Sequence, residues 1–443
     1  MPYPDSPFDA TFNPDIITSL KQYSESCSEV NLSETLKWLC TTPKVTSYRV
    51  NTLKTDRKIV KELIQEQLNA EAGAYGFRAE YSDFLPNVIV INHIDVNHGK
   101  LHKLPSEVMV DVDCAAAVLR GAHIYAPGVL SMISGTLIGD KVSIYADLNR
   151  KCKKGLLKIF PDNGKVFLGN GVVKMTRSML FGDNLAPEGV AVGVTETISG
   201  CPSIGDAFLP SGFAMLQNVP SIMCVNALDP QKNDLVLDMC ASPGNKTTHI
   251  AALMENQGTL IAIDKTAGKV AQLRKTCQIF AAKLRIFQAD SSKIVVEDPG
   301  QTAANVDQGP PFLPETFDKI LLDAPCSVLG KRPQFHNRVT EKVLKSYVPL
   351  QRKLFTSAVS LLKPKGRLVY STCTITLAEN EGIVEWALRT FKCLCLVNIA
   401  QHFGSPGWPG TTLTEAQRAK VQRFGPNLDP DTVGFFIACF EKN

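Results

Sequence analysis

From about residue 232 onward, short apolar runs alternate with longer amphipathic stretches, and this alternation restricts the fold more than any other feature. The apolar runs predict strands over 234–240, 259–264, 284–288, 319–323, 367–373 and 434–440. The stretches between them predict helices over 247–254, 268–281, 342–362 and 379–390. Such a chain forms a doubly wound, mostly parallel α/β sheet with helices on both faces. The segment 298–314, rich in Pro, Gly, Gln and Asn, is predicted to be a loop.

The residues before this region have a different character. Residues 1–40 are expected to be helical, with Ser33 capping a helix over 31–40. A small α+β unit then follows from a helix over 56–70 and from strands over 47–53 and 87–92. A helix over 107–119 is expected to lead into short apolar runs between glycines, at 122–125, 141–146, 166–168 and 189–195. Many short strands at even spacing are typical of a small β-barrel.

The sequence therefore predicts three parts. They are an α+β unit over 1–106, continued by 201–231 against the α/β core, a barrel over 107–200, and an α/β domain over 205–443.

Composition argues against several classes of protein. Hydrophobic residues make up 44% of the chain and charged residues 20%, which favours folding over disorder. No apolar run approaches the roughly 18 residues of a membrane span, and the first residues lack the features of a secretory signal, so no membrane partner is expected. The 13 cysteines form no C-x-x-C pair. This argues against a zinc site, whereas the odd number of cysteines, spread along the chain, argues against a disulfide framework and favours a reducing compartment, the cytoplasm.

A small turn follows the first predicted strand of the α/β region and reads Asp238-Met239-Cys240-Ala241-Ser242-Pro243-Gly244-Asn245-Lys246-Thr247. Such a turn lets a ligand approach the backbone and the N-terminus of the next helix. Asp264 ends the next strand, where a carboxylate can accept both hydroxyls of an adenosine ribose. Asp290 follows the third strand and is expected near the adenine edge. Taken alone, Asp264 could equally be a helix cap.

The turn does not match the patterns that bind phosphates. A P-loop needs glycines where this chain has Cys240 and Asn245, and a dinucleotide site needs a G-x-G-x-x-G pattern of which only Gly244 is present. A nucleoside without phosphates remains, and S-adenosyl-L-methionine is the common one. The sequence therefore predicts this cofactor.

Two cysteines lie just past strand ends, in Asp323-Ala324-Pro325-Cys326 and Ser371-Thr372-Cys373. Catalytic groups gather at the carboxyl ends of parallel strands, so both thiols are expected in one cleft. The arrangement suits methylation of carbon 5 of cytosine, which is too weak a nucleophile to take a methyl group directly. A thiolate that adds to carbon 6 activates carbon 5, and the carbon 5 proton must then leave so that the thiol can depart. Cys373, Cys326 and Asp323 can supply the nucleophile, a base and an acid near ring nitrogen 3.

From about residue 205 to the C-terminus, these segments together resemble the Nop/Sun family of RNA cytosine-5 methyltransferases. Arg49-Val50-Asn51-Thr52 is similar to a segment of the family's N-terminal unit. The stretches 120–128 and 167–171 resemble a PUA domain, which is a small RNA-binding barrel. A barrel before the catalytic core is similar to the branch of the family that methylates cytosine 72 near the 3′ end of certain tRNAs.

The resemblance implies a Rossmann-like class I methyltransferase fold and a role for each matching residue. Cys373 would be the attacking thiolate, Cys326 the cysteine needed for product release, and Asp323 a contact to the base. The cofactor would be held by Cys240, Ala241, Ser242, Pro243, Gly244, Asn245, Lys246, Asp264, Asp290 and Asp323.

Two positions depart from the family pattern. Asn245 stands where a second glycine is usual, and Asn tolerates left-handed backbone better than most residues. The loop after Cys326 reads Ser327-Val328-Leu329-Gly330 instead of the commoner Ser-Gly-x-Gly, which is expected to alter the target-base loop.

Basic residues are concentrated in the proposed barrel. The whole chain has a formal net charge of +4, whereas residues 151–177 hold six Lys and one Arg against one Asp. Basic side chains neutralise phosphates without reading sequence. The candidate RNA contacts are Arg120, Tyr125, Lys153, Lys154 and Asn170, with Lys331 and Arg332 beside the Cys326 turn.

The expected partner is the acceptor stem and 3′ end of tRNA, because a target cytosine leaves its stack more easily at a stem terminus. Messenger RNA is a further candidate, and a monomer is expected. Two rival functions stay open: a non-catalytic RNA-binding protein on a methyltransferase scaffold, and a DNA cytosine methyltransferase in which Cys326 attacks. Methylation of messenger or ribosomal RNA by the same chemistry is a further alternative.

Overall fold

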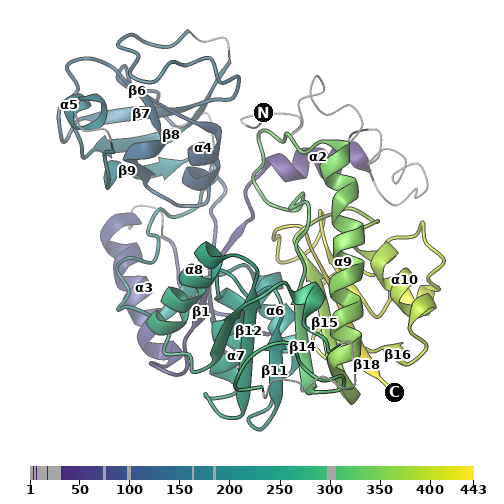
Figure 1. Cartoon of the computed structure of the whole chain (residues 1–443). Coiled ribbons are helices and arrows are strands. Elements are labelled where there is room, and N and C mark those ends of the chain that lie inside the picture. Colours follow the sequence, from purple (N-terminus) through teal and green to yellow (C-terminus); the bar gives the residue numbers. More distant parts are fainter. Residues whose placement is uncertain are drawn as a thin grey trace.

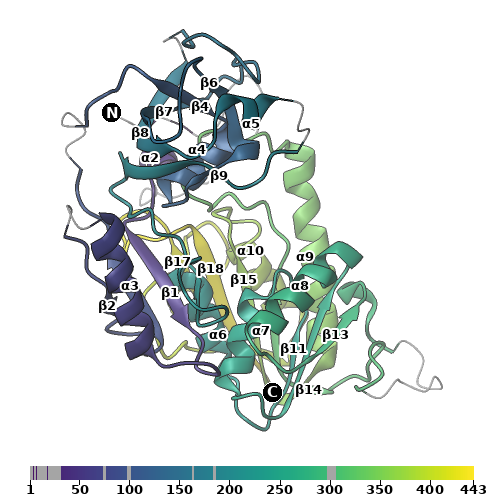
Figure 2. The ribbon, with the colours of Figure 1, turned by 90° about the vertical axis from the view of Figure 1, so that its left-hand side faces the viewer.

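The computed structural model describes Tyr3, Ser6, Ile17 and residues 31–72, 76–96, 101–161, 164–182, 186–296 and 306–443. These residues form one large sheet, a smaller N-terminal sheet beside it, and a separate sheet of six strands (Figure 1). In both views the six-stranded sheet lies at one end of the molecule, away from the large sheet (Figure 2).

The large sheet has the order β13-β12-β11-β14-β15-β18-β16, with β17 also paired to β18. Its strands are β11 (Leu235–Asp238), β12 (Thr259–Asp264), β13 (Arg285–Gln288), β14 (Phe317–Asp323), β15 (Leu362–Thr372), β16 (Leu394–Leu396), β17 (Gln422–Phe424) and β18 (Phe435–Lys442). The strands from β11 to β15 are parallel, and β18 runs antiparallel to β15. Strand order reverses between β11 and β14, which is where ligands bind in open α/β sheets. The predicted doubly wound, mostly parallel sheet is confirmed.

Helices cover both faces of this sheet because its central strands are apolar on both sides. They are α6 (Val219–Leu228), α7 (Asn245–Leu253), α8 (Ala267–Ile279), α9 (Glu341–Leu361), α10 (Glu381–Thr390) and the short α11 (Glu415–Arg418). Leu237 packs with Phe355 of α9 in one core cluster, whereas its neighbour Val236 packs with α6 and α7 in another. This alternation of neighbouring residues between two faces is the pleat of a strand.

The N-terminal sheet has the order β10-β1-β3-β2 and is antiparallel wherever these strands pair. It consists of β1 (Val45–Val50), β2 (Glu80–Tyr81), β3 (Val88–Asn92) and β10 (Ala214–Leu216), with α3 (Arg57–Ala72) packed on it. The edge strand β10 directly precedes α6 in the sequence. One continuous segment therefore connects the N-terminal sheet to a helix that covers the large sheet.

The six-stranded sheet has the order β5-β9-β8-β7-β4-β6. Its strands are β4 (Glu107–Val110), β5 (Ile124–Tyr125), β6 (Val129–Met132), β7 (Lys141–Asp147), β8 (Lys165–Val173) and β9 (Val190–Thr197), with α4 (Val112–Leu119) and α5 (Arg177–Phe181) beside them. Gly169 has a φ of +151°, and a Cβ there would lie 2.0 Å from the Glu196 carbonyl oxygen, so this crossing of β8 and β9 requires glycine.

Several boundaries differ from the predictions. Residues 107–110 form strand β4, not the start of a helix, because they pair with β7 and β6 and because Asp111 caps α4 at Cys114 N. Asn31 caps α2 (Leu32–Cys40), not Ser33. The strands β16 and β17 and the helix α6 were not predicted.

Two further expectations concern residues that are described only in part. Most of residues 1–30 and the stretch 297–305 lie outside the described residues, whereas 306–314 contain only turns and a bridge to Val295. Within the described ranges, no helix is long and apolar enough to cross a membrane.

Candidate functional site

The carboxyl ends of five parallel strands bring the predicted site residues together. The 239–246 turn follows β11, Asp264 ends β12, Asp290 follows β13, Asp323 ends β14 and Cys373 follows β15. This edge includes the reversal of strand order between β11 and β14. Polar groups from distant parts of the sequence therefore meet where a ligand is expected.

The two predicted thiols face each other. Cys326 Sγ and Cys373 Sγ are 3.4 Å apart; Cys326 is 6% exposed, and Cys373 is partly exposed. The pKa of the Cys373 thiol is lowered, mainly because Cys326 donates a hydrogen bond to it. The same bond, together with burial, raises the pKa of Cys326. Cys373 is therefore the thiol of the pair that ionises more readily.

Lys246 and Asp323 form an ion pair beside the thiols. Lys246 Nζ lies 2.6 Å from Asp323 Oδ2, and Ser371 Oγ donates to Asp323 Oδ1 at 2.7 Å. Burial alone would lower the pKa of Lys246, but Asp323 raises it above its usual value. Asp323 opposes the Cys373 thiolate and Lys246 favours it, and 30% of the Asp323 side chain is exposed. The sequence placed Lys246 in the cofactor turn but did not reveal this pairing.

We expect Cys326→Ala to raise the pH midpoint of Cys373 alkylation. The donor that stabilises the thiolate would be lost, and a lost partner of the charged form raises the pKa of a thiol. The measurement is the rate of Cys373 modification by iodoacetamide against pH, read by peptide mass spectrometry. An unchanged or lower midpoint would contradict the direction of hydrogen bonding given above.

The turn after β11 is held by its own backbone and by Asp264. Gly244 N donates to Ala241 O at 2.8 Å, and Ser242 N donates to Asp264 Oδ2 at 3.0 Å. Gly244 has a φ of +108°, and a Cβ there would lie 3.1 Å from Leu273 of α8. The left-handed residue is therefore Gly244, whereas Asn245 is the first residue of α7. The usual second glycine is not required for the backbone at Asn245.

Two acids on neighbouring strands suit the polar parts of a nucleoside. Asp264 receives a backbone N–H on each carboxylate oxygen, from Ser242 and Lys265, which leaves lone pairs on both for ribose hydroxyls. Burial opposes ionisation of Asp290, but Lys265 at 2.9 Å and hydrogen bonds from Ser292 lower its pKa to about 2. These donors and acceptors fit the predicted cofactor. In the described ranges, no three His, Cys, Asp or Glu side chains lie together as metal ligands.

The loop after Cys326 passes close to β18. A Cβ at Gly330 would lie 2.1 Å from the Gly434 carbonyl oxygen, so the two glycines allow a close contact of backbones. Val328, which replaces the family's usual glycine, has a φ of +58° and is 43% exposed. A β-branched residue in this region is strained, so the departure seen in the sequence places strain beside the thiol pair.

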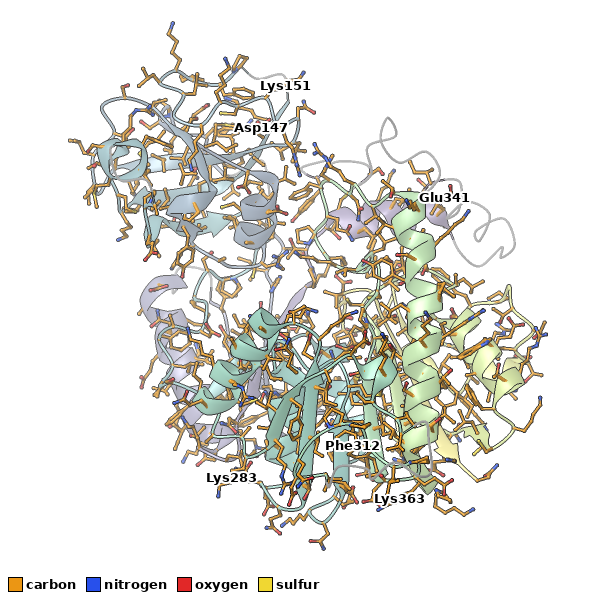
Figure 3. All side chains as sticks on the ribbon, viewed as in Figure 1. Asp147, Lys151, Lys283, Phe312, Glu341 and Lys363 are labelled. Atoms are coloured by element: carbon orange, nitrogen blue, oxygen red, sulfur yellow. The ribbon has the colours of Figure 1, made fainter. Side chains whose placement is uncertain are left out.

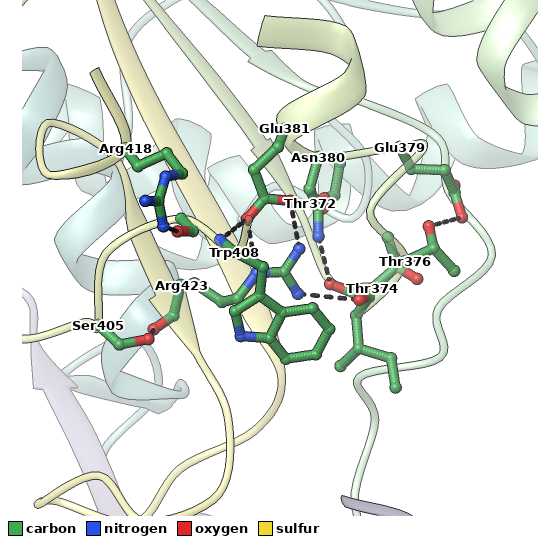
Figure 4. A network of polar contacts seen from close by, with 12 residues as sticks. Thr372, Thr374, Thr376, Glu379, Asn380, Glu381, Ser405, Trp408, Arg418 and Arg423 are labelled. Atoms are coloured by element: carbon green, nitrogen blue, oxygen red, sulfur yellow. Dashed lines mark hydrogen bonds and ion pairs between the residues drawn. The ribbon is translucent and has the colours of Figure 1, made fainter. Parts of the chain in front are cut away.

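A buried polar cluster next to the thiols was not predicted. It contains Glu379, Asn380 and Glu381 at the start of α10, with Arg423 of β17 (Figure 4). In the sequence, this cluster is visible as a run of three polar residues, Glu379-Asn380-Glu381, a few positions after Cys373. The start of a helix would by itself explain such a run, so the run did not indicate a buried cluster.

The candidate RNA contacts have different surroundings. Lys153 and Lys154 are exposed, Tyr125 is 54% exposed, and Lys151 of the same loop lies at the outer end of the six-stranded sheet (Figure 3). Arg120 is half-buried and donates to Arg332 O at 3.3 Å. Arg120 and Tyr125 line a cavity of about 750 Å³ that also reaches the N-terminal sheet and Asn245.

Two of the predicted RNA contacts need correction. Asn170 is 7% exposed, and its amide bonds to Ser143, His102 O and Glu196, so it holds strands together. Arg332 is 1% exposed and pairs with Asp431 at 2.6 Å. Neither side chain is available to RNA in this structure, because each already serves buried partners.

Known proteins are similar to nearly the whole chain. A model of the family described as 16S rRNA methyltransferase RsmB/F matches residues 225–441. The chain is 42% identical to the mouse tRNA (cytosine(72)-C(5))-methyltransferase NSUN6, over 90% of this chain and 87% of that protein. It is 40% identical to the human protein of the same name, over 97% and 94%. A crystal structure of NSun6 from Pyrococcus horikoshii with SFG, an analogue of S-adenosylmethionine, superposes with a TM-score of 0.72 at 30% identity, covering 98% of this chain and 99% of that one.

Proposed function

Because the chain belongs to the RsmB/F (Nop/Sun) family of S-adenosylmethionine-dependent RNA cytosine-5 methyltransferases, we propose that it forms 5-methylcytosine at cytosine 72 of tRNA. The observation that carries the proposal is the 3.4 Å thiol pair just past the carboxyl ends of β14 and β15, next to the reversal of strand order. The choice of tRNA is supported by the names of the mouse and human relatives. Their similarity extends over the six-stranded sheet as well as the catalytic core.

The reaction begins at Cys373. Its thiolate adds to carbon 6 of cytosine, and the electron pair of the double bond between carbons 5 and 6 shifts to carbon 5, which becomes nucleophilic. Carbon 5 then takes the methyl group from the sulfonium of the cofactor, which leaves as S-adenosylhomocysteine. Loss of the carbon 5 proton to solvent breaks the bond between Cys373 and carbon 6, and the electron pair returns to sulfur. One methyl group thus replaces one proton.

Cys326 assists the last step as a hydrogen-bond donor. Its thiol lies 3.4 Å from Cys373 Sγ, and as a hydrogen-bond donor it lowers the pKa of Cys373 and stabilises this sulfur as it departs. The high pKa of Cys326 favours this role over proton abstraction, because a base must first lose its own proton.

Asp323 and Lys246 hold the target base. Asp323, which Lys246 contacts at 2.6 Å, accepts from the exocyclic amino group of cytosine. The Lys246 ammonium stabilises the negative charge that develops toward ring nitrogen 3 when the thiolate attacks carbon 6. The residues of the 240–246 turn, with Asp264 and Asp290, hold the cofactor beside them.

The six-stranded sheet binds the RNA. We assign it as a PUA barrel over 107–200 that binds the 3′ end of the acceptor stem, and the enzyme acts as a monomer. The exposed Lys153 and Lys154 meet phosphates, whereas Tyr125 and Arg120 line the cavity that leads toward the cofactor turn. The distance between barrel and thiols would then select the base that enters the site.

The proposal predicts methylation of tRNA transcripts that depends on one base. Purified protein and S-adenosylmethionine should convert cytosine 72 in a transcript with an intact 3′ end, as read by bisulfite sequencing. A transcript with uridine at position 72 and one that lacks its 3′ end should show at least a tenfold lower rate, on the order of the cost of lost positioning. Equal methylation of an unrelated messenger RNA hairpin would contradict the choice of tRNA.

A further inference from the structure

The Glu379 carboxylate is buried against the loop that carries Cys326. It is 1% exposed and accepts four hydrogen bonds. Ser327 donates from its backbone N at 3.0 Å and from Oγ at 2.5 Å, Thr376 Oγ1 donates at 2.8 Å, and Gln351 Nε2 donates at 3.0 Å. In the described residues, none of these partners is Lys or Arg, so the carboxylate is bound by neutral donors. Burying a carboxylate without a cationic partner is costly, which indicates that this carboxylate has a role.

The next residue, Asn380, holds the segment that carries Cys373. Its Oδ1 accepts from Thr372 Oγ1 at 2.5 Å, and its Nδ2 donates to Thr374 O at 3.0 Å, so it contacts the residues on both sides of Cys373. A bond of 2.7 Å between Ser327 Oγ and Thr374 Oγ1 joins the two segments. Figure 4 shows Glu379 beside Thr376, and Asn380 beside Thr372 and Thr374.

We propose that Glu379 is a positioning residue for methyl transfer, which holds Cys326 against Cys373 and places a buried negative charge next to the Cys326 loop. The proposal rests on the two-thiol mechanism proposed above and adds a residue that acts through Cys326. Two hydrogen bonds from Ser327 to Glu379 fix the residue that follows Cys326. Gln351, which also donates to Glu379, donates to Pro325 O at 3.0 Å and so fixes the residue that precedes Cys326.

Charge gives Glu379 its second effect. A nearby carboxylate disfavours a thiolate, and Glu379 adds to the bond from Cys373 and to burial in raising the pKa of Cys326. Because Ser327 directly follows Cys326, the hydrogen bonds from Ser327 to Glu379 place this charge next to the Cys326 loop.

Glu379→Gln tests the charge with little change in contacts. A glutamine oxygen could accept from Ser327 N and Gln351 Nε2, while its NH₂ group donates to the hydroxyls of Ser327 and Thr376, which can reverse. The matched control is Glu385→Gln on α10, which removes a partly exposed carboxylate that contacts Thr412.

The first measurement needs no RNA. In the Cys373→Ser background, the pH midpoint of Cys326 alkylation by iodoacetamide should fall by about one unit with Glu379→Gln, which is about tenfold faster alkylation below the midpoint. Glu385→Gln should not move it. A residue with only a structural role would change the rate at every pH by exposing Cys326 and leave the midpoint unchanged, which would overturn the proposal.

The second measurement uses wild-type thiols, S-adenosylmethionine and a tRNA transcript with cytosine 72, and Cys326→Ala serves as reference. Glu379→Gln should accumulate about tenfold more covalent adduct than the wild type, because Cys326 no longer assists release. If Cys326→Ala accumulates adduct and Glu379→Gln does not, the role of Glu379 is wrong. If Cys326→Ala accumulates none, the proposed mechanism fails, and the alkylation midpoint still decides the effect of Glu379 on Cys326.

Ser327→Ala keeps the proposal testable if Glu379→Gln does not fold. This variant removes one of the four donors and leaves the charge in place. It should accumulate adduct with an unchanged alkylation midpoint in the Cys373→Ser background, and wild-type adduct levels would overturn the positioning role.

Discussion

Cys373→Ala should abolish both methylation and the covalent adduct with RNA, whereas Cys326→Ala should retain the adduct and release it slowly. The first variant lacks the only sulfur whose pKa is lowered within the pair, so carbon 6 would have no thiolate to attack it. Removing a nucleophile of this kind lowers the rate by roughly 10⁴-fold or more. The measurement combines transfer of labelled methyl groups to tRNA with denaturing gels that separate free protein from protein bound to RNA.

The control for loss of a thiol is Cys395→Ala. Cys395 is partly exposed on β16, away from the strand ends that form the site. This variant should match the wild type in both assays. The opposite pattern at the site, with an adduct in Cys373→Ala and none in Cys326→Ala, would make Cys326 the nucleophile, as in the rival DNA methyltransferase.

The sequence was enough to predict that the two thiols meet. Apolar runs identified the parallel strands, and the carboxyl ends of parallel strands lie on one edge, so residues just past β14 and β15 had to be neighbours. The same reasoning placed the 239–246 turn and Asp264 on that edge. These predictions needed only the period and order of the elements, which local sequence carries well.

The surroundings of single polar side chains could not be predicted in this way. Arg332 and Asn170 have polar side chains of the kind usually found at the surface. They are buried because partners from distant segments accept their hydrogen bonds. The carboxylate of Glu379 likewise meets donors from α9 and from the Cys326 loop. Such contacts depend on how elements pack, and the spacing of residues along one element does not specify them.

The short strands that pair with β18 could not be predicted from the sequence pattern either. β16 and β17 have three residues each and pair with β18 only after the chain has turned back. Segments this short show no clear period of two, so they differ little from loops.

Arg423→Met should strongly lower the free energy of unfolding of the protein. Arg423 is 1% exposed and pairs with Glu381, which is 0% exposed; Nε donates to Glu381 Oε1 at 2.8 Å, and Nη2 donates to Oε2 at 2.5 Å. Breaking a buried pair leaves an uncompensated charge and costs about 3–5 kcal/mol. The measurement is the urea midpoint of unfolding, followed by circular dichroism.

The double variant Arg423→Met with Glu381→Leu separates the charge from the packing. Since it removes both ions, it should recover much of the lost stability, as replacement of a whole buried pair is often neutral. Arg423 also donates from Nη1 to Ile375 O at 2.8 Å, two residues after Cys373, and Glu381 directly follows Asn380. We therefore expect the double variant to remain folded but to methylate more slowly, because the segment around Cys373 loses a contact. A double variant no more stable than Arg423→Met would show that the arginine acts through its packing on Trp408, 3.8 Å from its guanidinium carbon to the ring centre.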